Sequence, residues 1–167
     1  MNEIILATPK DVTEIMTMIH EIYEAIPRKE WFFLDEDDAV TAYMTTEGFA
    51  LKAVCDGALA GVFIVRTKQL GDENIGHDLK FDEEQCRQTA HMEIAMVKKE
   101  YRGQGLQHKM MEKAERILKE KGFHYLVGTA HPDNKASVNS FLKLEYEQVM
   151  TKEKYGGMTR SIFCKKI

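Results

Sequence analysis

The sequence predicts an α/β fold in one domain, with a central mixed, mostly antiparallel sheet of about seven strands flanked by about four helices. Three observations predict this class. Strand-like and helical runs alternate along the chain, and Asp56-Gly57 separates two β-rich runs as in a tight hairpin. From residue 91 the order strand, glycine loop, helix, strand, helix is a crossover that makes its two strands parallel. The 167 residues suffice for one hydrophobic core, so we expect a single domain over residues 1–167.

The first part of the chain predicts a strand, two helices and the two strands of the hairpin, in this order, at residues 2–8, 12–26, 35–46, 48–56 and 59–68. In the first helix, apolar side chains recur at helical spacing from Val12 to Ile26. Asp11 and Glu14 resemble a capping box at its start, and Pro27 ends the pattern. This stripe of apolar side chains predicts core packing.

Residues 69–89 are polar, contain glycine and have no clear period. We expect them to form a long functional or mobile insertion. Together with the stretch WFFLDEDD at residues 31–38, they suggest an aromatic and acidic wall for a cleft.

The second part of the chain predicts a strand, a helix, a strand, a helix and two final strands around Gly156-Gly157. The first of these helices is the most regular element. Its apolar side chains repeat on one face from Leu106 to Leu118, and Gly122 closes it. In a crossover of this kind, ligands bind at the carboxyl ends of the parallel strands, which is where the glycine loop lies.

Charge and composition exclude several classes of function. A formal net charge of -4 argues against a nucleic-acid binder, which concentrates basic residues on one face. No apolar stretch approaches the roughly 18 residues of a membrane span, and no export signal is apparent, so we expect no membrane association. The three cysteines are far apart and lack ligand spacing, which predicts neither disulfides nor a metal site and fits a cytoplasmic protein.

The stretch EYRGQGLQHK, residues 100–109, is the main functional signal. Gly103 and Gly105 allow backbone conformations that side chains prevent, and a helix starting near Leu106 presents unpaired N–H groups and a partial positive charge. With the cation of Arg102 beside it, the loop suits an anion such as a phosphate. It matches neither the GxxxxGK[ST] loop nor the GxGxxG fingerprint, and a tight structural turn is the alternative.

The segment VKKEYRGQGLQHKMMEKAERILKEKGF resembles the signature of the GCN5-related N-acetyltransferases (GNAT), whose R/Q-x-x-G-x-G/A loop binds the pyrophosphate of acetyl-CoA through backbone amides. The later stretch HPDNKASVNSFLKLEYEQV resembles the family's Asn-x-x-A/S, aromatic and Leu-Gly-Phe helix. The resemblance spans the whole chain. It implies the acyl-CoA N-acyltransferase fold, acetyl-CoA as co-substrate without a metal, and an amine as acceptor.

Carried over to matching positions, the resemblance implies that the strand residues Ala95, Met96 and Val97 line the pantetheine arm through backbone hydrogen bonds. It implies that the pyrophosphate is held by the loop residues Arg102, Gly103, Gln104, Gly105, Leu106 and Gln107. Asn134 falls on the family's asparagine, where a helix N-cap is a second reading, and both can hold. Asn139, one turn beyond Lys135, is expected to reach the pantetheine arm.

Three positions depart from the family pattern. Gln107 replaces the final Gly or Ala of the loop, so its side chain points away from the phosphates or donates to them. Glu145 replaces a helix-ending glycine, at a cost of roughly 1 kcal/mol for a left-handed residue, so we expect the helix to end by a different turn. Phe141 replaces a tyrosine that protonates the leaving thiolate in the family. Tyr155 is a candidate substitute for this proton donor, and the alternative is that Tyr155 is only a packed or exposed aromatic residue.

An acceptor amine with a pKa of about 10.4 is almost fully protonated at pH 7, so transfer needs a base. His91 and Glu93 are two apart on a predicted strand and so share one face, as do strand bases in members of the family. We expect Glu93 to act as the base through water, with His91 assisting. The alternative is a solvated strand face without a role. His131 is interpreted as structural or as cleft lining.

The sequence thus predicts an N-acetyltransferase that moves the acetyl group of acetyl-CoA directly to a primary amine of a small molecule or peptide. Transfer is expected in a ternary complex without a covalent enzyme intermediate, since no cysteine is placed for one. The alternatives are a non-catalytic acyl-CoA-binding or regulatory module, suggested by Phe141, and an unrelated phosphate-binding domain. The resemblance is compatible with a homodimer.

Overall fold

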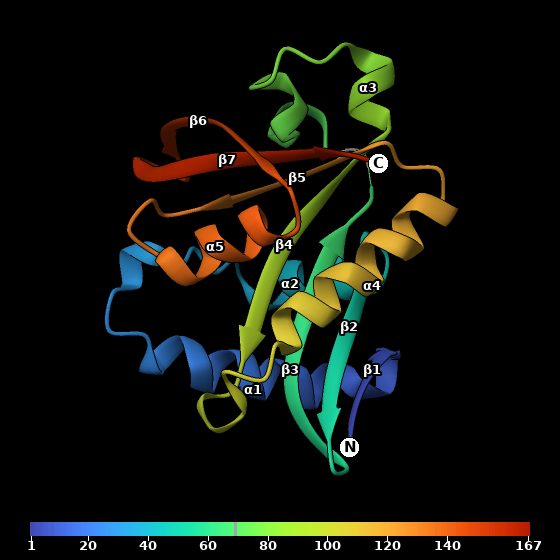
Figure 1. Ribbon diagram of the computed structural model, residues 1–167, viewed down its shortest axis with the longest axis vertical. Helices are drawn as coiled ribbons and strands as arrows, with labels where there is room; N and C mark the ends of the chain where they lie inside the picture. Colours follow the sequence, from blue (N-terminus) through green and yellow to red (C-terminus); the bar gives the residue numbers. More distant parts are fainter. Residues whose placement is uncertain (69) are drawn as a thin grey trace.

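The computed structural model describes residues 1–68 and 70–167. Gln69, the first residue of the predicted insertion, lies outside the described residues. The described chain forms a seven-stranded sheet in the order β1-β2-β3-β4-β5-β7-β6, in which β4 and β5 are parallel and all other neighbours are antiparallel (Figure 1). The strands are β1 (Asn2–Leu6), β2 (Gly48–Cys55), β3 (Ala58–Arg66), β4 (Thr89–Val97), β5 (Tyr125–Ala130), β6 (Glu147–Lys154) and β7 (Met158–Lys166). The predicted α/β class and mixed sheet are confirmed.

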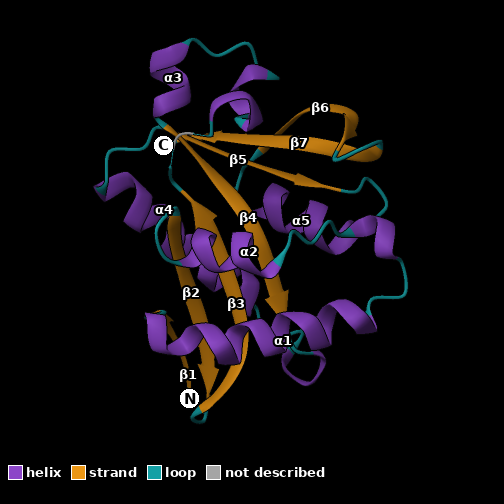
Figure 2. Cartoon of the chain, turned by 180° about the vertical axis from the view of Figure 1, so that it is seen from behind, coloured by secondary structure: helices purple, strands orange, loops and turns teal. Residues whose placement is uncertain are grey.

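Helices cover both faces of the sheet. They are α1 (Val12–Ala25), α2 (Asp37–Met44), α3 (Glu83–Arg87), α4 (Leu106–Glu120) and α5 (Lys135–Lys143). In Figure 1, α4 and α5 lie in front of the sheet, and the reverse view in Figure 2 brings α1 and α2 to the front. None of the helices in the described parts of the chain is long and apolar enough to cross a membrane.

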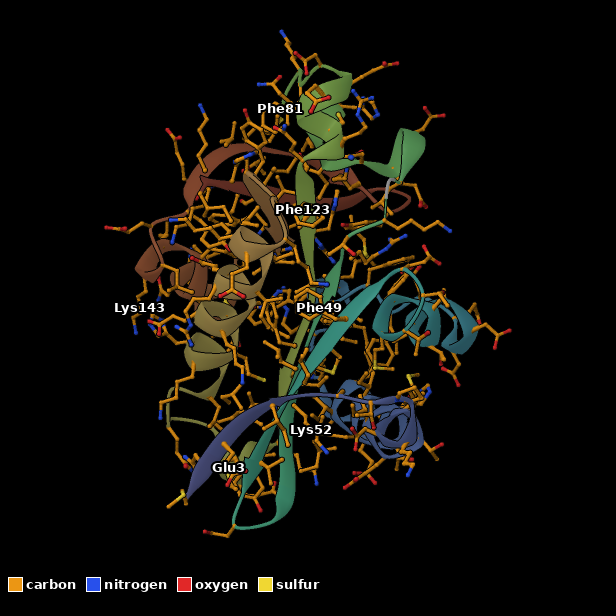
Figure 3. The ribbon with its side chains drawn as sticks, turned by 90° about the vertical axis from the view of Figure 1, so that its right-hand side faces the viewer. Glu3, Phe49, Lys52, Phe81, Phe123 and Lys143 are labelled. Atoms are coloured by element: carbon orange, nitrogen blue, oxygen red, sulfur yellow. The ribbon has the colours of Figure 1, made fainter. Side chains whose placement is uncertain are left out.

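The inner strand β3 is buried on both sides because its side chains alternate between two cores. Phe63 and Val65 pack with α4 and α5, whereas Val62 and Ile64 pack with α1 and α2. Figure 3 views the sheet along its plane, with Phe49 of β2 on the α4 side. Because a hydrophobic core packs on each face of the sheet, β3 and β4 are held rigidly in place.

The described residues of the predicted functional or mobile insertion, between β3 and β4, contain short regular elements that the sequence pattern did not indicate. They form two short 3-10 turns, Gly71–Glu73 and Ile75–His77, and the helix α3. A capping box starts α3: Asp82 Oδ1 accepts from the Gln85 N–H at 2.8 Å, and Gln85 Oε1 accepts from the Asp82 N–H at 3.0 Å. Elements of three to five residues are too short for a helical period to show, although the Asp-x-x-Gln spacing was a readable signal.

The end of α5 also differs from expectation. Glu145 adopts a left-handed φ of 66°, as the family's glycine would. Its N–H bonds to the Leu142 carbonyl at 3.0 Å, and the Tyr146 N–H bonds to the Phe141 carbonyl at 3.0 Å, which is the Schellman arrangement. The rings of Phe141 and Tyr146 meet edge to face, 5.1 Å between centroids. This buried contact holds the turn in place despite the strain at Glu145.

The parallel pair β4–β5 is short, and this creates the site. Only Thr89, Ala90 and His91 of β4 pair with β5. Beyond His91 the two strands diverge, as Figures 1 and 2 show. The edge of β4 from Met92 to Val97 is therefore free of β5, and its backbone groups face a gap between the strands.

Candidate active site

A cleft of about 530 Å³ lies where β4 and β5 diverge. Its floor is the free edge of β4, and its far wall is α5. The predicted coenzyme residues Ala95, Met96, Val97, Arg102, Gly103, Gly105, Leu106, Gln107 and Asn134 all line it. The fold thus brings together most of the residues that the sequence assigned to the coenzyme.

The glycine loop at one end of the cleft is a cradle of backbone N–H groups. Gly103 and Gly105 have left-handed φ values of 81° and 73°, and a Cβ at either position would meet no protein atom within 4 Å. The glycines are therefore needed for backbone conformation rather than for space inside the protein. Within the described residues, no protein group accepts a hydrogen bond from the N–H groups of residues 103–108. This arrangement at the start of α4 suits a pyrophosphate.

The side chains of the loop have separate partners. Arg102 Nε donates to the Val97 carbonyl at 3.1 Å, which holds the guanidinium at the end of β4 beside the cleft. Gln104 turns away, since its Oε1 accepts from Asn2 Nδ2 at 3.1 Å, so any contribution to the cradle comes from its backbone. Gln107 lines the cleft, which is compatible with donation to a phosphate.

On α5, Asn134 both caps the helix and lines the cleft. Its Oδ1 accepts from the Ser137 N–H at 3.4 Å. Asn139, by contrast, is exposed and is absent from the lining, so its expected contact with the pantetheine arm is not supported. Ser137 and Ser140 line the cleft in its place. The helical period explains this, because Ser137 and Ser140 are three residues apart and share one face of α5, whereas Asn139 points away from that face.

A second cavity, of about 410 Å³, adjoins β4 and is called here the acceptor cavity. Its walls come from the segment before α2, α2, β3, the insertion, β4 and the β6–β7 hairpin. The lining residues are Phe33, Asp35, Tyr43, Arg66, Leu70, Glu73, Ile75, His91, Glu93, Lys152, Glu153, Lys154 and Tyr155. Of all described residues, Glu93 alone lines both this cavity and the cleft.

Glu93 owes its position to a β-bulge. Val65 of β3 pairs with Met92 and Ile64 with Ile94, so Glu93 is an extra residue on β4. Burial raises the pKa of its carboxyl to about 7, while the Arg66 guanidinium, with Nη1 at 3.7 Å from Oε1, opposes the rise. A carboxyl that titrates near neutral pH at the edge of a cleft has the properties of a general base.

His91 lines the acceptor cavity together with Glu93, but the lone pair of its unprotonated ring nitrogen already accepts a hydrogen bond. The residue is 3% exposed, and its Nε2 accepts from the Ile75 N–H at 3.0 Å. Burial, aided by Arg66 and Lys154, lowers its pKa to about 3. The neutral ring therefore carries its proton on Nδ1 and has no acceptor left for a substrate proton. This geometry argues against an assisting base and makes His91 an anchor for the insertion.

Tyr155 lies in the turn between β6 and β7, with a positive φ of 53°. Its hydroxyl is 3.3 Å from Thr129 Oγ1, a residue of β5 that lines the cleft, and its ring stacks on Phe33 with 5.1 Å between centroids. Burial raises the pKa of the hydroxyl, so it holds its proton at neutral pH. Sequence reasoning did not identify Thr129 as a partner, because β5 and the hairpin are far apart in the chain.

Phe141 and His131 have packing roles. The Phe141 ring stacks on Phe163 at 4.7 Å and lies against Gly128, where a Cβ would come within 2.5 Å of the ring. His131 Nδ1 accepts from the Asp133 N–H at 3.1 Å, and its ring stacks on Trp31 at 6.1 Å. The structural interpretation of His131 fits these contacts.

The chain belongs to the acetyltransferase (GNAT) family, whose model matches residues 15–146. Solved structures of the same fold include a GNAT acetyltransferase from Streptococcus pneumoniae, at 16% identity over 100% of both chains and a TM-score of 0.77. The ribosomal-protein-S18-alanine N-acetyltransferase of Escherichia coli is 15% identical over 100% of this chain and 94% of its own, with a TM-score of 0.72. No curated protein sequence matches the chain significantly.

A Salmonella typhimurium structure described as an acetyltransferase with its cofactor acetyl-CoA is 15% identical over 99% of this chain and 94% of its own, with a TM-score of 0.74. The recognised family and the acyltransferase fold are thereby confirmed. Acetyl-CoA is the co-substrate of the family, and the glycine loop and the free edge of β4 fit its pyrophosphate and pantetheine. Among the described residues, no group of three or more His, Cys, Asp or Glu side chains is placed to hold a metal ion.

Proposed function

We propose that this protein is an N-acetyltransferase that moves the acetyl group of acetyl-CoA directly to a primary amine of a small molecule or peptide. One observation carries the proposal: Glu93, with a pKa raised to about 7, is shared by the coenzyme cleft and the acceptor cavity. A base at this junction can take a proton from an amine in one cavity while the thioester lies in the other.

Acetyl-CoA supplies an activated acyl group whose thiolate leaves readily. The N–H groups of residues 103–108 and the cation of Arg102 hold its pyrophosphate, and the free edge of β4 orients the arm that carries the acyl group. Orientation of this kind converts a bimolecular attack into an intramolecular one. The chain itself forms no covalent bond to the acyl group.

Glu93 accepts the proton of the acceptor ammonium, directly or through one water, and frees the nitrogen lone pair for attack on the thioester carbon. The new C–N bond forms as the C–S bond breaks, and the electron pair of that bond goes to sulfur. Tyr155 donates a proton to this sulfur, with its hydroxyl held beside the cleft by Thr129. The attacking nitrogen loses a second proton to solvent as the C–S bond breaks, which leaves a neutral amide and a free thiol. Tyr155 then regains a proton from solvent and Glu93 releases its own, so the reaction sets one proton free overall.

A non-catalytic acyl-CoA-binding module is the second candidate, and Phe141 favours it because the side chain at this position cannot donate a proton. Two measurements separate the candidates. A thermal-shift titration with acetyl-CoA raises the melting temperature for both, since each binds coenzyme in the folded state. Release of free thiol across a panel of polyamines, amino acids, aminoglycosides and peptides then occurs for an enzyme and is absent for a binding module. A missing thermal shift at saturating coenzyme rejects both.

A further inference from the structure

Arg66 is a buried cation next to Glu93. Its side chain is 9% exposed, and it lines the acceptor cavity near the end of β3. In the register of the sheet it lies opposite His91, two residues from Glu93 on the neighbouring strand. Burying an arginine is costly unless anions surround it, so its neighbours indicate its role.

Three carboxylates surround this guanidinium, those of Glu47 at 3.6 Å and of Glu73 and Glu93 at 3.7 Å. At these distances the contacts are ion pairs rather than direct hydrogen bonds. The guanidinium also lies over the Tyr43 ring, 4.0 Å from its centroid, and the Tyr43 hydroxyl donates to Asp35 at 2.7 Å. Because the ring fixes one face of the guanidinium, its charge stays at the wall of the cavity.

The three carboxylates differ in how strongly the charge of Arg66 affects their ionisation. Glu73 is 76% exposed on the insertion, so water largely screens its pair, and Glu47 lies outside the cavity. Glu93 is the one whose burial favours the protonated acid, which cannot act as a base. Other charged or titratable side chains around the same cavity are Asp35, Tyr43, Glu73, His91, Lys152, Glu153, Lys154 and Tyr155. Asp35 and Glu73 act against ionisation of Glu93, and Arg66 is the charge that favours it most.

We propose that Arg66 is a positioning residue for the transfer reaction: its guanidinium holds Glu93 at the junction of the two cavities and keeps the carboxyl ionised, ready to accept the proton of the acceptor amine. This inference rests on the proposed role of Glu93 as the base. It adds a second residue to the proton-accepting machinery, one that touches neither the acyl group nor the amine nitrogen.

The test compares Arg66→Met and Arg66→Lys with the wild type by two readouts. The first is the titration of the Glu93 carboxyl, followed by NMR in protein labelled with ¹³C at the glutamate carboxyl, with Glu93→Gln identifying the signal. The second is the pH profile of kcat/KM with the best amine. In Arg66→Met, both midpoints move upward by at least about one pH unit, because an opposite charge at this range lowers a carboxyl pKa by about one to three units. Arg66→Lys keeps the positive charge but lacks the planar guanidinium, so its midpoint lies between those of the wild type and Arg66→Met.

Glu47→Gln is the matched control, since it removes a carboxylate from the same guanidinium without contacting Glu93. Its midpoint stays within about 0.3 pH units of the wild type, as expected for a partly screened neighbour outside the cavity. A thermal shift with acetyl-CoA verifies that each variant has kept its cleft. An NMR midpoint that does not move in Arg66→Met overturns the inference and leaves the proposed function standing. A midpoint that moves while the rate profile does not supports the Arg66–Glu93 coupling and overturns Glu93 as the base.

Discussion

The coenzyme cleft and the acceptor cavity meet at Glu93 and are built in opposite ways. The cleft takes the largest share of its lining from one stretch, β4 through the start of α4, and the groups that we propose to hold the coenzyme there are backbone N–H groups. The acceptor cavity gathers side chains from six separate segments. Substitution cannot remove a backbone N–H except by proline, whereas each wall of the acceptor cavity can change with a single residue. This difference suits a constant co-substrate on one side and a variable acceptor on the other.

The largest expected effect is on the rate of acetyl transfer and leaves coenzyme binding unchanged. Glu93→Gln lowers the rate of thiol release by about 10²- to 10⁴-fold, because general-base catalysis typically contributes that much. The affinity for acetyl-CoA stays near that of the wild type, since the loop and the backbone that we propose to hold the coenzyme are unchanged. Single-turnover kinetics and calorimetric binding measure the two quantities. A loss of rate below tenfold would show that the amine loses its proton elsewhere.

The next effect tests whether the affinity for acetyl-CoA depends on the backbone conformation of the glycine loop. Gly105→Ala puts a side chain on a left-handed residue, which costs about 1–2 kcal/mol and distorts the cradle. We expect the affinity for acetyl-CoA to fall at least about tenfold, as 1.4 kcal/mol corresponds to a factor of ten. Gly122→Ala is the control, because Gly122 is also left-handed and open but lies beyond the far end of α4. Equal loss of affinity in both variants would contradict a specific role for the loop.

A smaller effect is expected for the proton donor. Tyr155→Phe lowers kcat by about tenfold and leaves coenzyme affinity unchanged, since a thiolate with a pKa of about 8.5 leaves without full protonation. Steady-state kinetics with the best amine measure it. Tyr125→Phe removes a tyrosine hydroxyl outside both cavities and should leave kcat as it is. If Tyr155→Phe matches this control, the thiolate is protonated by solvent.

The smallest effect is expected for a substitution outside both cavities. Glu145→Gly relieves the left-handed strain at the end of α5 and raises the free energy of unfolding by about 0.5–1 kcal/mol after the entropy cost of a glycine. Thermal unfolding should then shift upward by about 1–4 °C for a chain of this size. Glu120→Gly, at the right-handed end of α4, should lower the stability instead. Turnover is unchanged in both, and a destabilised Glu145→Gly would show that the turn carries no strain.

Features set by local sequence were predictable, and those set by distant contacts were not. The glycine loop, α4 and the β2–β3 hairpin follow from spacing and turn residues, and the structure has them where expected. Asn139 was placed one position off the cleft-facing side of α5. The bulge at Glu93, the bond from the insertion to His91, and the meeting of Arg66 with Glu47 and Glu73 depend on tertiary packing. No periodicity or motif encodes such contacts.

The most direct test of the account is the pH profile of kcat/KM for the wild type and Glu93→Gln with the same amine. A base with a pKa of about 7 must be ionised to act, so the wild-type rate should rise tenfold per pH unit below pH 7 and level off above it. In Glu93→Gln the level region above pH 7 should disappear, because only the neutral amine then reacts and its fraction keeps rising toward the amine pKa of about 10.4. A variant whose rate rises and levels off with the same midpoint as the wild type would contradict the claim that Glu93 is the base between the coenzyme cleft and the acceptor cavity.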